Sequence, residues 1–248
     1  MVGVTPFRHD VEMVWSSSLR QLLHVGARAL DILCPPSCAA CGSVGAEVCR
    51  SCRCSIVEEL RTNHLSHSTD PNCTIVSEFG GRLRDVLSGM KFKNHRGAAR
   101  YLGGLVARKL ISDGVVPGVD VQAVTWVPTT ARRRRDRGFD PSELMARIVG
   151  AQLGLPVVRM LDRVDSGEQK SRSRIERLNG PGFRGRRTRF DRVVLIDDVV
   201  TTGATMAAAS GALRTAGISH IHSAAVAETP RRKAETLQSP REQYSTAA

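Results

Sequence analysis

The chain of 248 residues is 41% hydrophobic and only 4% aromatic, and its 36 basic residues against 24 acidic ones give a formal net charge of +12. This size and composition allow one α/β domain with a small appendage and an aliphatic core, and the charge favours polyanionic partners such as nucleotides, nucleic acid or acidic surfaces. No stretch reaches the roughly 18 apolar residues of a membrane span, and His9, Asp10 and Glu12 precede any apolar run, so we expect no membrane span, no signal peptide and a cytoplasmic protein.

Residues 1–33 form an N-terminal segment in which one helix is predicted. The hydroxyl side chains of Ser16, Ser17 and Ser18 suit a helix cap. Leucines at positions 19, 22, 23, 30 and 33 then recur on one face of such a helix. We expect residues 34–72 to form a separate small unit, because six of the seven cysteines fall between positions 34 and 54.

That unit contains two Cys-x-x-Cys pairs, namely Cys38 with Cys41 and Cys49 with Cys52. Four thiolates at this spacing predict a tetrahedral, structural Zn²⁺ site of the zinc-ribbon kind, followed by a polar connection. In a reducing compartment such crowding favours metal binding, and disulfide bonds are the alternative. Cys34 or Cys54 can replace a neighbouring ligand, and the sequence leaves that choice open. A segment of about 20 residues needs such a metal site in order to fold, because its own hydrophobic core is too small.

Residues 73–228 have the pattern of one α/β domain. The predicted elements are a helix over 83–90, a helix over 98–111, a strand over 119–127, an arginine-rich loop over 132–137, a helix over 141–153, a mobile loop over 163–185, a strand over 193–196, a helix over 202–216 and a strand over 220–226. Their alternation predicts a parallel sheet with helices on both faces. Residues 229–248 are polar and lack periodicity, which predicts a disordered tail.

Two adjacent carboxylates follow the apolar run 193–196. Asp197 and Asp198 stand at the carboxyl end of that predicted strand, where open α/β sheets bind their ligands. Successive strand residues point to opposite faces, so the two carboxylates are expected to do different jobs. One reaches ligand hydroxyls or a hydrated Mg²⁺, and the other braces the turn or reaches a second hydroxyl.

The turn after these carboxylates suits a phosphate group. It consists of Thr201, Thr202, Gly203, Ala204 and Thr205. Backbone N–H groups at the start of a helix attract anions, threonine hydroxyls add donors, and Gly203 allows close approach of the backbone. A phosphate site beside a pair of diol-binding carboxylates fits a ribose 5-phosphate. The alternative is a turn whose small residues serve packing alone.

The run 193–205 resembles, at every position, the phosphoribosyl pyrophosphate (PRPP) signature of type I phosphoribosyltransferases. The resemblance implies that fold, with Asp197 and Asp198 holding ribose hydroxyls and Mg²⁺ and with residues 201–205 holding the 5-phosphate. Thr201 is like the orotate-type version of the signature, which argues against a 6-oxopurine acceptor. Residues 129–137 lie where such enzymes hold pyrophosphate, which assigns Arg132 and Arg137 to PRPP, and Arg174 falls in the stretch that corresponds to their flexible catalytic loop. Some of these arginines can instead contact a nucleic-acid backbone or simply be solvated.

Over residues 30–228 the chain is similar to the ComF family. The blocks that carry the resemblance are Cys38-x-x-Cys41-Gly42 with Cys49-x-x-Cys52, Gly80 to Arg84 with Met90 to Lys93, Trp126-Val127-Pro128 with Arg132 to Asp140, Leu161 to Arg163 with Gln169, Ser173-Arg174 and Glu176-Arg177, and the run 193–205. The family usually has Asn where this chain has Asp140, which places an acid in a segment that should favour anions. The stretch from Asn179 to Phe183 also departs from the family's usual sequence.

The resemblance implies two functions of different classes. The first is an enzyme in which a nitrogen nucleophile displaces pyrophosphate from C1 of Mg²⁺-bound PRPP. The second is a non-catalytic factor for single-stranded DNA in competence and DNA uptake, with PRPP or a phosphoribosyl nucleotide as regulator and a competence helicase as the family-based partner. The basic charge favours the second, but the scarcity of aromatic residues argues against it, because base-stacking platforms need several. The sequence does not identify an acceptor base.

Overall fold

The computed structural model describes residues 35–62, 72–164 and 182–230. Within them, a sheet of four strands has the order β1 (Cys73–Glu78), β6 (His220–Glu228), β5 (Arg192–Val200) and β2 (Ala123–Trp126), and every pairing is parallel. A separate antiparallel pair joins β3 (Leu161–Val164) to β4 (Gly182–Gly185). The predicted parallel sheet is thus confirmed.

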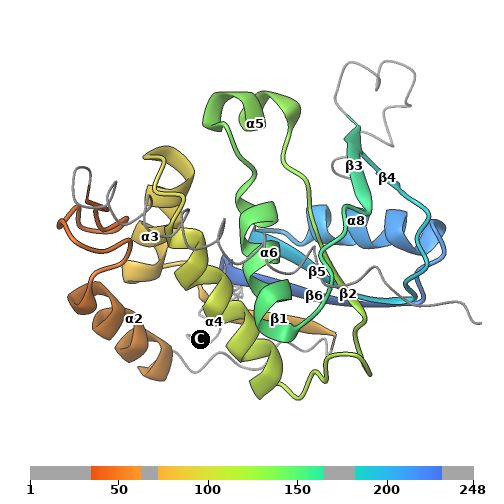
Figure 1. Ribbon diagram of the computed structural model, residues 1–248, viewed down its shortest axis with the longest axis horizontal. Coiled ribbons are helices and arrows are strands. Elements are labelled where there is room, and N and C mark those ends of the chain that lie inside the picture. Colours follow the sequence, from red (N-terminus) through yellow and green to blue (C-terminus); the bar gives the residue numbers. More distant parts are fainter. Residues whose placement is uncertain (1–34, 63–71, 165–181, 231–248) are drawn as a thin grey trace, which may run out of the picture.

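Helices cover both faces of the sheet, as the sequence predicts (Figure 1). The described helices are α2 (Arg50–Thr62), α3 (Gly81–Phe92), α4 (Ala98–Ser112), α5 (Ala131–Arg137), α6 (Pro141–Leu153) and α8 (Ala204–Thr215). Helices α4 and α6 pack on one face and α8 packs on the other. None of the helices in this described part of the chain is long and apolar enough to cross a membrane.

The position of strand β5 in the middle of the structure explains why residues 193–196 are all apolar. Val194 and Ile196 belong to the hydrophobic cluster under α4 and α6, whereas Val193 and Leu195 belong to the cluster under α8. All four side chains are completely buried. A strand covered on both faces gains from apolar residues at every position, so it has no polar alternation.

Helix α2 and strand β1 lie in stretches where no regular element was predicted. Helix α2 begins inside the cysteine segment and takes up residues 55–62 of the polar connection expected after residue 54. Its residues Cys52 and Ile56 lie one turn apart and are both buried. Strand β1 is only six residues long and has just Ile75 and Val76 as an apolar run, too short a signal to predict a strand, yet it pairs in parallel with β6.

Three other expectations need correction. The predicted strand over 119–127 is confined to β2, because Gly118 adopts a positive φ and residues 117–121 form a turn. The expected loop at 132–137 is helix α5, with Thr130 at its N-cap and Gly138 at its left-handed C-cap. The ends of the expected mobile loop 163–185 belong to β3 and β4.

Some predictions lie outside the described residues. These are the N-terminal helix before residue 34, positions 165–181 of the expected mobile loop, and the tail from residue 231.

The cysteine segment shares its core with the rest of the protein. Cys38 and Val48 belong to the same hydrophobic cluster as Leu87 of α3. The Glu59 carboxylate of α2 accepts hydrogen bonds from the backbone N–H of Arg82, at 2.8 and 3.1 Å, and so caps the start of α3. The segment is therefore held against α3, one wall of the cavity described below.

Candidate functional site

A cavity of about 570 Å³ lies at the carboxyl end of β5. Of the residues predicted to form the site, five line it: Asp197, Asp198, Thr201, Thr205 and Arg137. Other walls come from the last turn of α3, from the residues that precede α6, and from β3. The cavity therefore collects side chains from segments far apart in the chain, at the sheet edge where α/β proteins bind ligands.

Asp197 is surrounded by hydrogen-bond donors. Its Oδ1 accepts from the Ser142 Oγ at 3.2 Å and from the backbone N–H of Asp198 at 2.8 Å. Burial raises the pKa of this carboxyl to about 7, and the neighbouring charge of Asp198 adds to the rise. A group that titrates near neutrality can accept a hydrogen bond or hold a proton in the same place.

Asp198 has a different partner. Its Oδ1 lies 2.8 Å from the Nζ of Lys91, and the two side chains are 17% and 18% exposed. The ion pair joins the end of β5 to the last turn of α3, 107 positions earlier in the chain. The two adjacent carboxylates thus face different groups, in keeping with the different jobs expected from strand alternation.

The five residues after β5 form an exposed turn that opens α8. Gly203 is the N-cap, with a left-handed φ of 78°, and as a glycine it supplies no capping side chain. Thr202 Oγ1 accepts a hydrogen bond from the backbone N–H of Ala204 at 3.3 Å. Since the first N–H groups of a helix have no partner within it, this terminus can bind an anion. Thr201 and Thr205 line the cavity, whereas Thr202, Gly203 and Ala204 do not.

The arginines of α5 divide into two groups. Arg137 lines the cavity, and its guanidinium lies 5.3 Å from the centre of the Phe92 ring. Arg132 points into solvent with 88% of its side chain exposed, 3.8 Å from Asp136 on the same helix, and it does not line the cavity. Arg174 lies outside the described residues. Arg133 and Arg163 line the cavity although neither was predicted as a site residue.

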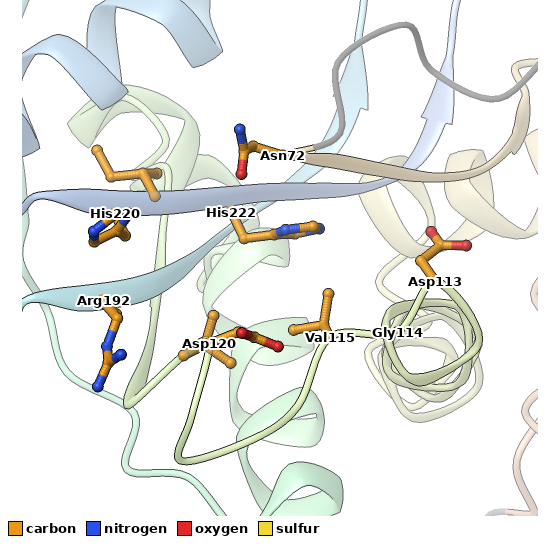
Figure 2. A pocket seen from close by; sticks show the side chains of 10 residues that line it. Asn72, Asp113, Gly114, Val115, Asp120, Arg192, His220 and His222 are labelled. Atoms are coloured by element: carbon orange, nitrogen blue, oxygen red, sulfur yellow. The ribbon is translucent and has the colours of Figure 1, made fainter.

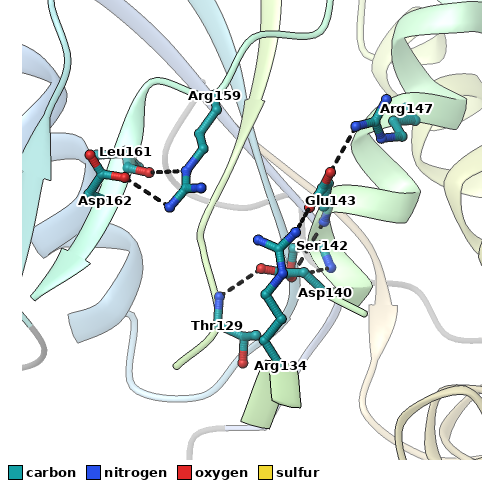
Figure 3. Close-up of polar contacts among 9 residues, drawn as sticks. All are labelled: Thr129, Arg134, Asp140, Ser142, Glu143, Arg147, Arg159, Leu161 and Asp162. Atoms are coloured by element: carbon teal, nitrogen blue, oxygen red, sulfur yellow. Dashed lines mark hydrogen bonds and ion pairs between the residues drawn. The ribbon is translucent and has the colours of Figure 1, made fainter. Parts of the chain in front are cut away.

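Asp140, the acid that departs from the family pattern, is buried. Figure 3 shows its contacts with Thr129 and Ser142. Its Oδ2 accepts from the Thr129 backbone N–H at 2.9 Å, and its Oδ1 accepts from those of Ser142 and Glu143 at 3.1 and 3.5 Å. Burial raises its pKa despite these three donors. The carboxylate is thus the N-cap of α6 and ties the entry of α5 to it, so its negative charge is engaged by backbone donors.

The four predicted metal ligands lie together. The Sγ atoms of Cys38, Cys41, Cys49 and Cys52 are all within 4.8 Å of one another. Those of Cys41 and Cys49 are 3.7 Å apart, which matches the roughly 3.8 Å edge of a tetrahedron with Zn–S bonds of about 2.3 Å. Cys54 is exposed on α2 and is not part of the group, and Cys34 lies outside the described residues.

The electrostatics of this cluster suit a bound cation. Hydrogen bonds from the backbone and side chain of Cys52, together with Ser43, lower the pKa of the Cys49 thiol to about 6. Burial and the neighbouring sulfur atoms raise the pKa of Cys52. Four thiolates this close repel one another, and a divalent ion offsets that repulsion. The cluster therefore fits a tetrahedral metal ion with a closed coordination shell.

A second cavity, of about 370 Å³, lies at the amino ends of β5 and β6, which is the opposite edge of the sheet from the first cavity (Figure 2). His220 and His222 of β6 line it with Arg192, Asp113 and Asp120. Thr74 Oγ1 donates to Asp113 Oδ2 and lies 2.9 Å from His222 Nε2. Asp120 Oδ2 accepts from the Val116 backbone N–H, so the carboxylates here serve local structure.

Sequence reasoning assigned no role to two polar residues that touch the carboxylates. Lys91 stands in a block quoted for the family resemblance, and its rarity was a usable signal, since only five of the 36 basic residues are lysines. Ser142 follows a capping Asp and Pro141, a pattern that predicts a helix start and gives no sign of a contact with β5.

The family model of the phosphoribosyl transferase domain matches residues 111–243, which is just over half of the chain. No curated protein matches the chain at a significant level.

The chain is similar to two solved phosphoribosyl-related enzymes. One is the glutamine PRPP amidotransferase from B. subtilis complexed with ADP and GMP, at 23% identity and a TM-score of 0.39, with 53% of this chain and 26% of that chain covered. The other is the purine phosphoribosyltransferase from Pyrococcus horikoshii Ot3, at 18% identity and a TM-score of 0.34, with 54% of this chain and 74% of that chain covered. The match thus spans about a quarter of the length of the amidotransferase.

Proposed function

The chain belongs to the phosphoribosyl transferase domain family, and from this premise we propose that it binds PRPP with Mg²⁺ at the carboxyl end of β5 and transfers the phosphoribosyl group to a nitrogen acceptor. The observation that carries the proposal is one cavity shared by Asp197, Asp198, Thr201, Thr205 and Arg137. A carboxylate pair, a helix N-terminus and a cation correspond to the three parts of PRPP: diol, monophosphate and diphosphate.

The 5-phosphate would be held by the turn that opens α8. Its backbone N–H groups supply donors, the helix dipole adds attraction, and Thr201 and Thr205 contribute hydroxyls from the cavity wall. Gly203 adopts a left-handed φ and has open space where a Cβ would stand, so the N-cap residue itself leaves the approach to the helix terminus open. Thr202 and Ala204 act in this proposal through the backbone of the same turn.

The ribose hydroxyls would be bound by the carboxylates of Asp197 and Asp198. Ser142 and the Asp198 N–H orient the Asp197 carboxylate, so its hydrogen-bonding geometry is set before ligand arrives. Displacement of pyrophosphate from C1 leaves positive charge on the ribose ring and negative charge on the leaving group. In this proposal the carboxylates stabilise the positive charge on the ribose ring. Arginines 133, 137 and 163, which line the cavity, offset the negative charge of the diphosphate.

The donor set near β5 also fits Mg²⁺. This ion keeps several waters and is usually bound by one or two carboxylates together with substrate phosphates, which is what Asp197, Asp198 and PRPP would provide. When bound, Mg²⁺ neutralises charge on the diphosphate. Arg132 and Arg174 complete the predicted PRPP set as proposals, with Arg132 reaching the ligand only by a movement of its exposed side chain.

We further propose that the protein is a ComF member with a structural Zn²⁺ on its four clustered cysteines. Supporting this are the order of its sequence blocks and the clustering of the four sulfur atoms within 4.8 Å of one another. Zinc suits four thiolates and carries no redox chemistry of its own, which fits a site that holds α2 and α3 together.

A second candidate function is binding of single-stranded DNA, in competence and with a competence helicase as partner. The observation that favours it is the exposed row of arginines on α5, of which Arg132 lies outside the cavity. Helix α5 and the β3–β4 pair both project from the same side of the sheet in Figure 1. Arginines on such a projection can follow a phosphate backbone without using the cavity.

A pyrophosphate-release assay with Mg²⁺, PRPP and a panel of nitrogen bases tests the enzymatic proposal. We expect turnover with at least one base and its loss in Asp198→Asn, with Asp120→Asn, at the opposite sheet edge, unaffected. Anisotropy of a labelled oligonucleotide at several salt concentrations tests the second candidate. Salt-sensitive binding that survives Asp198→Asn but weakens in an Arg132→Ala/Arg135→Ala variant would assign DNA to α5.

A further inference from the structure

The ion pair between Lys91 and Asp198 places a cation where the proposed function requires another one. The Lys91 Nζ lies 2.8 Å from Asp198 Oδ1, and both side chains are more than four-fifths buried. Asp198 is also a proposed ligand of the Mg²⁺–PRPP complex. One carboxylate oxygen cannot serve an ammonium group and a divalent ion at full strength, because the two cations repel one another.

A lysine at this position is notable in this chain. Lysine occurs five times among 36 basic residues, so arginine is the general choice for positive charge. Arginine holds a carboxylate with a rigid, bidentate fork, whereas lysine is a compact point charge on a flexible stem. An ammonium group can therefore leave Asp198 and move to another anion within reach of its stem.

The helix that carries Lys91 is fixed, so any movement belongs to the side chain. Gly89, one half-turn earlier, packs so closely on the cysteine segment that a Cβ there would lie 2.0 Å from the Ala39 carbonyl oxygen. Leu87 and Met90 are fully buried on the same helix. Lys91 itself lines the cavity, along with the Arg137 and Thr201 side chains assigned to PRPP.

We propose that Lys91 is an internal counter-ion of the site: it neutralises Asp198 in the free protein, keeps a divalent ion from binding alone, and moves to the diphosphate when metal and PRPP enter together. The proposal rests on the proposed function. Metal ion and PRPP then bind with positive coupling, because PRPP supplies the anion that receives the displaced ammonium group. Lys91 acts on the metal through Asp198, which makes it a positioning residue.

The test measures Mn²⁺ binding to zinc-replete protein by the electron paramagnetic resonance signal of free Mn²⁺. Mn²⁺ does not displace Zn²⁺ from thiolates, so the cysteine site stays filled. Lys91→Gln removes the charge and keeps a hydrogen-bond donor, and Lys91→Met repeats the test without one. Lys91→Arg keeps the charge in a form that holds Asp198 more firmly. Lys93→Met, an exposed lysine two positions on, is the matched control.

We expect Mn²⁺ alone to bind Lys91→Gln at least tenfold more tightly than wild type, and Lys91→Arg no more tightly than wild type. Addition of PRPP should strengthen Mn²⁺ binding much more in wild type than in Lys91→Gln, with the coupling factor at least tenfold smaller in the variant. Lys93→Met should behave as wild type. Asp198→Asn in the Lys91→Gln background should abolish the gain, which assigns the gained site to Asp198.

An unchanged or weaker Mn²⁺ affinity in both Lys91→Gln and Lys91→Met would overturn the proposal, and weaker binding is also what a purely structural role predicts. The Mn²⁺ measurement without PRPP stands by itself. If PRPP fails to bind wild type while Lys91→Gln still gains Mn²⁺ affinity, the proposed function fails and the counter-ion role of Lys91 stands. If PRPP binds and the gain is missing, the reverse conclusion follows.

Discussion

Asp197 and Asp198 are neighbours in the chain, yet their surroundings make them chemically different. Asp197 accepts hydrogen bonds from neutral donors and has a pKa raised to about 7, chiefly by burial. Asp198 pairs with an ammonium group. Asp197 is therefore suited to accept a hydrogen bond or to hold a proton. Asp198 is suited to supply a negative charge to a cation.

The raised pKa of Asp197 makes folding stability depend on pH. Between about pH 4 and pH 7 the folded protein holds a proton that the unfolded chain has lost, so wild type loses stability as pH rises through this window. Asp197→Asn removes the titration and keeps an oxygen acceptor. We expect urea unfolding without added Mg²⁺ to show the variant gaining more than about 1 kcal/mol on wild type between pH 4.5 and pH 8. A difference that stays constant with pH, or grows towards acid, would contradict this environment for Asp197.

At this scale the sequence could predict only groupings that lie within one segment. Asp197, Asp198 and the threonine turn are contiguous, and their chemistry follows from their position after a buried strand. Lys91 and Ser142 were not assigned because their contacts join elements distant in the chain, and periodicity carries no information about such contacts. Arg133 and Arg163 were not predicted as site residues for the same reason.

Among the elements, α3 links the cysteine cluster to the cavity at the end of β5. Its Gly89 touches the backbone of the cysteine segment, and its last turn carries Lys91 to the end of β5. The side chains on its buried face, such as Leu83 and Val86, fix it against the core. The position of one cavity wall therefore depends on the packing of a turn that holds two of the cysteines.

The close contact at Gly89 can be tested with a single methyl group. Gly89→Ala places a Cβ 2.0 Å from the Ala39 carbonyl oxygen, which forces α3 and the cysteine segment apart. We expect a loss of about 1–3 kcal/mol in the free energy of unfolding, as for overpacked cores. Gly211→Ala is the matched control, since α8 leaves open space there and alanine should stabilise that helix by about 0.5–1 kcal/mol. Equal effects in both variants, measured by urea unfolding, would show that the Gly89 contact does not restrain α3.

Elements with clear periodicity were predicted, and those set by tertiary contacts were not. Helices α3, α4 and α6 have apolar stripes that fix their type, and their predicted ranges agree with the structure to within a few residues. Helix α5 has no buried residue, so only its caps at Thr130 and Gly138 define it. Strand β1 is defined by its pairing with β6, whose residues lie 150 positions further along the chain.

At the scale of the whole molecule, the described residues combine a segment with four clustered cysteines and a parallel sheet around a common hydrophobic core. Cys38 and Cys52 contribute to the cluster that also contains Val194 and Ile196 of β5. The sequence predicted the two parts as separate units because each has its own signature. Their fusion into one core could not be inferred, because it depends on how α2 and α3 pack.

This shared core predicts that metal removal affects more than the cysteine segment. A strong chelator, or Cys38→Ser, should remove the tie between the knuckle of Cys38 and Cys41 and the start of α2. We expect thermal unfolding to shift to lower temperature by at least about 5 °C, and Mg²⁺–PRPP binding to weaken because α3 loses its support. Cys54→Ser, which alters an exposed cysteine outside the cluster, should leave both measurements unchanged. A chelated protein that melts as wild type would show that the cluster holds no structural metal.

The central claim is that the carboxyl end of β5 binds PRPP, and calorimetric titration of zinc-replete protein with PRPP and Mg²⁺ tests it most directly. The account predicts magnesium-dependent binding by wild type and its loss in an Asp197→Asn/Asp198→Asn variant that melts normally. An Asp113→Asn/Asp120→Asn variant, which removes the same charge at the opposite edge of the sheet, should bind as wild type. Absence of binding by folded wild type, or equal binding by both double variants, would contradict the account.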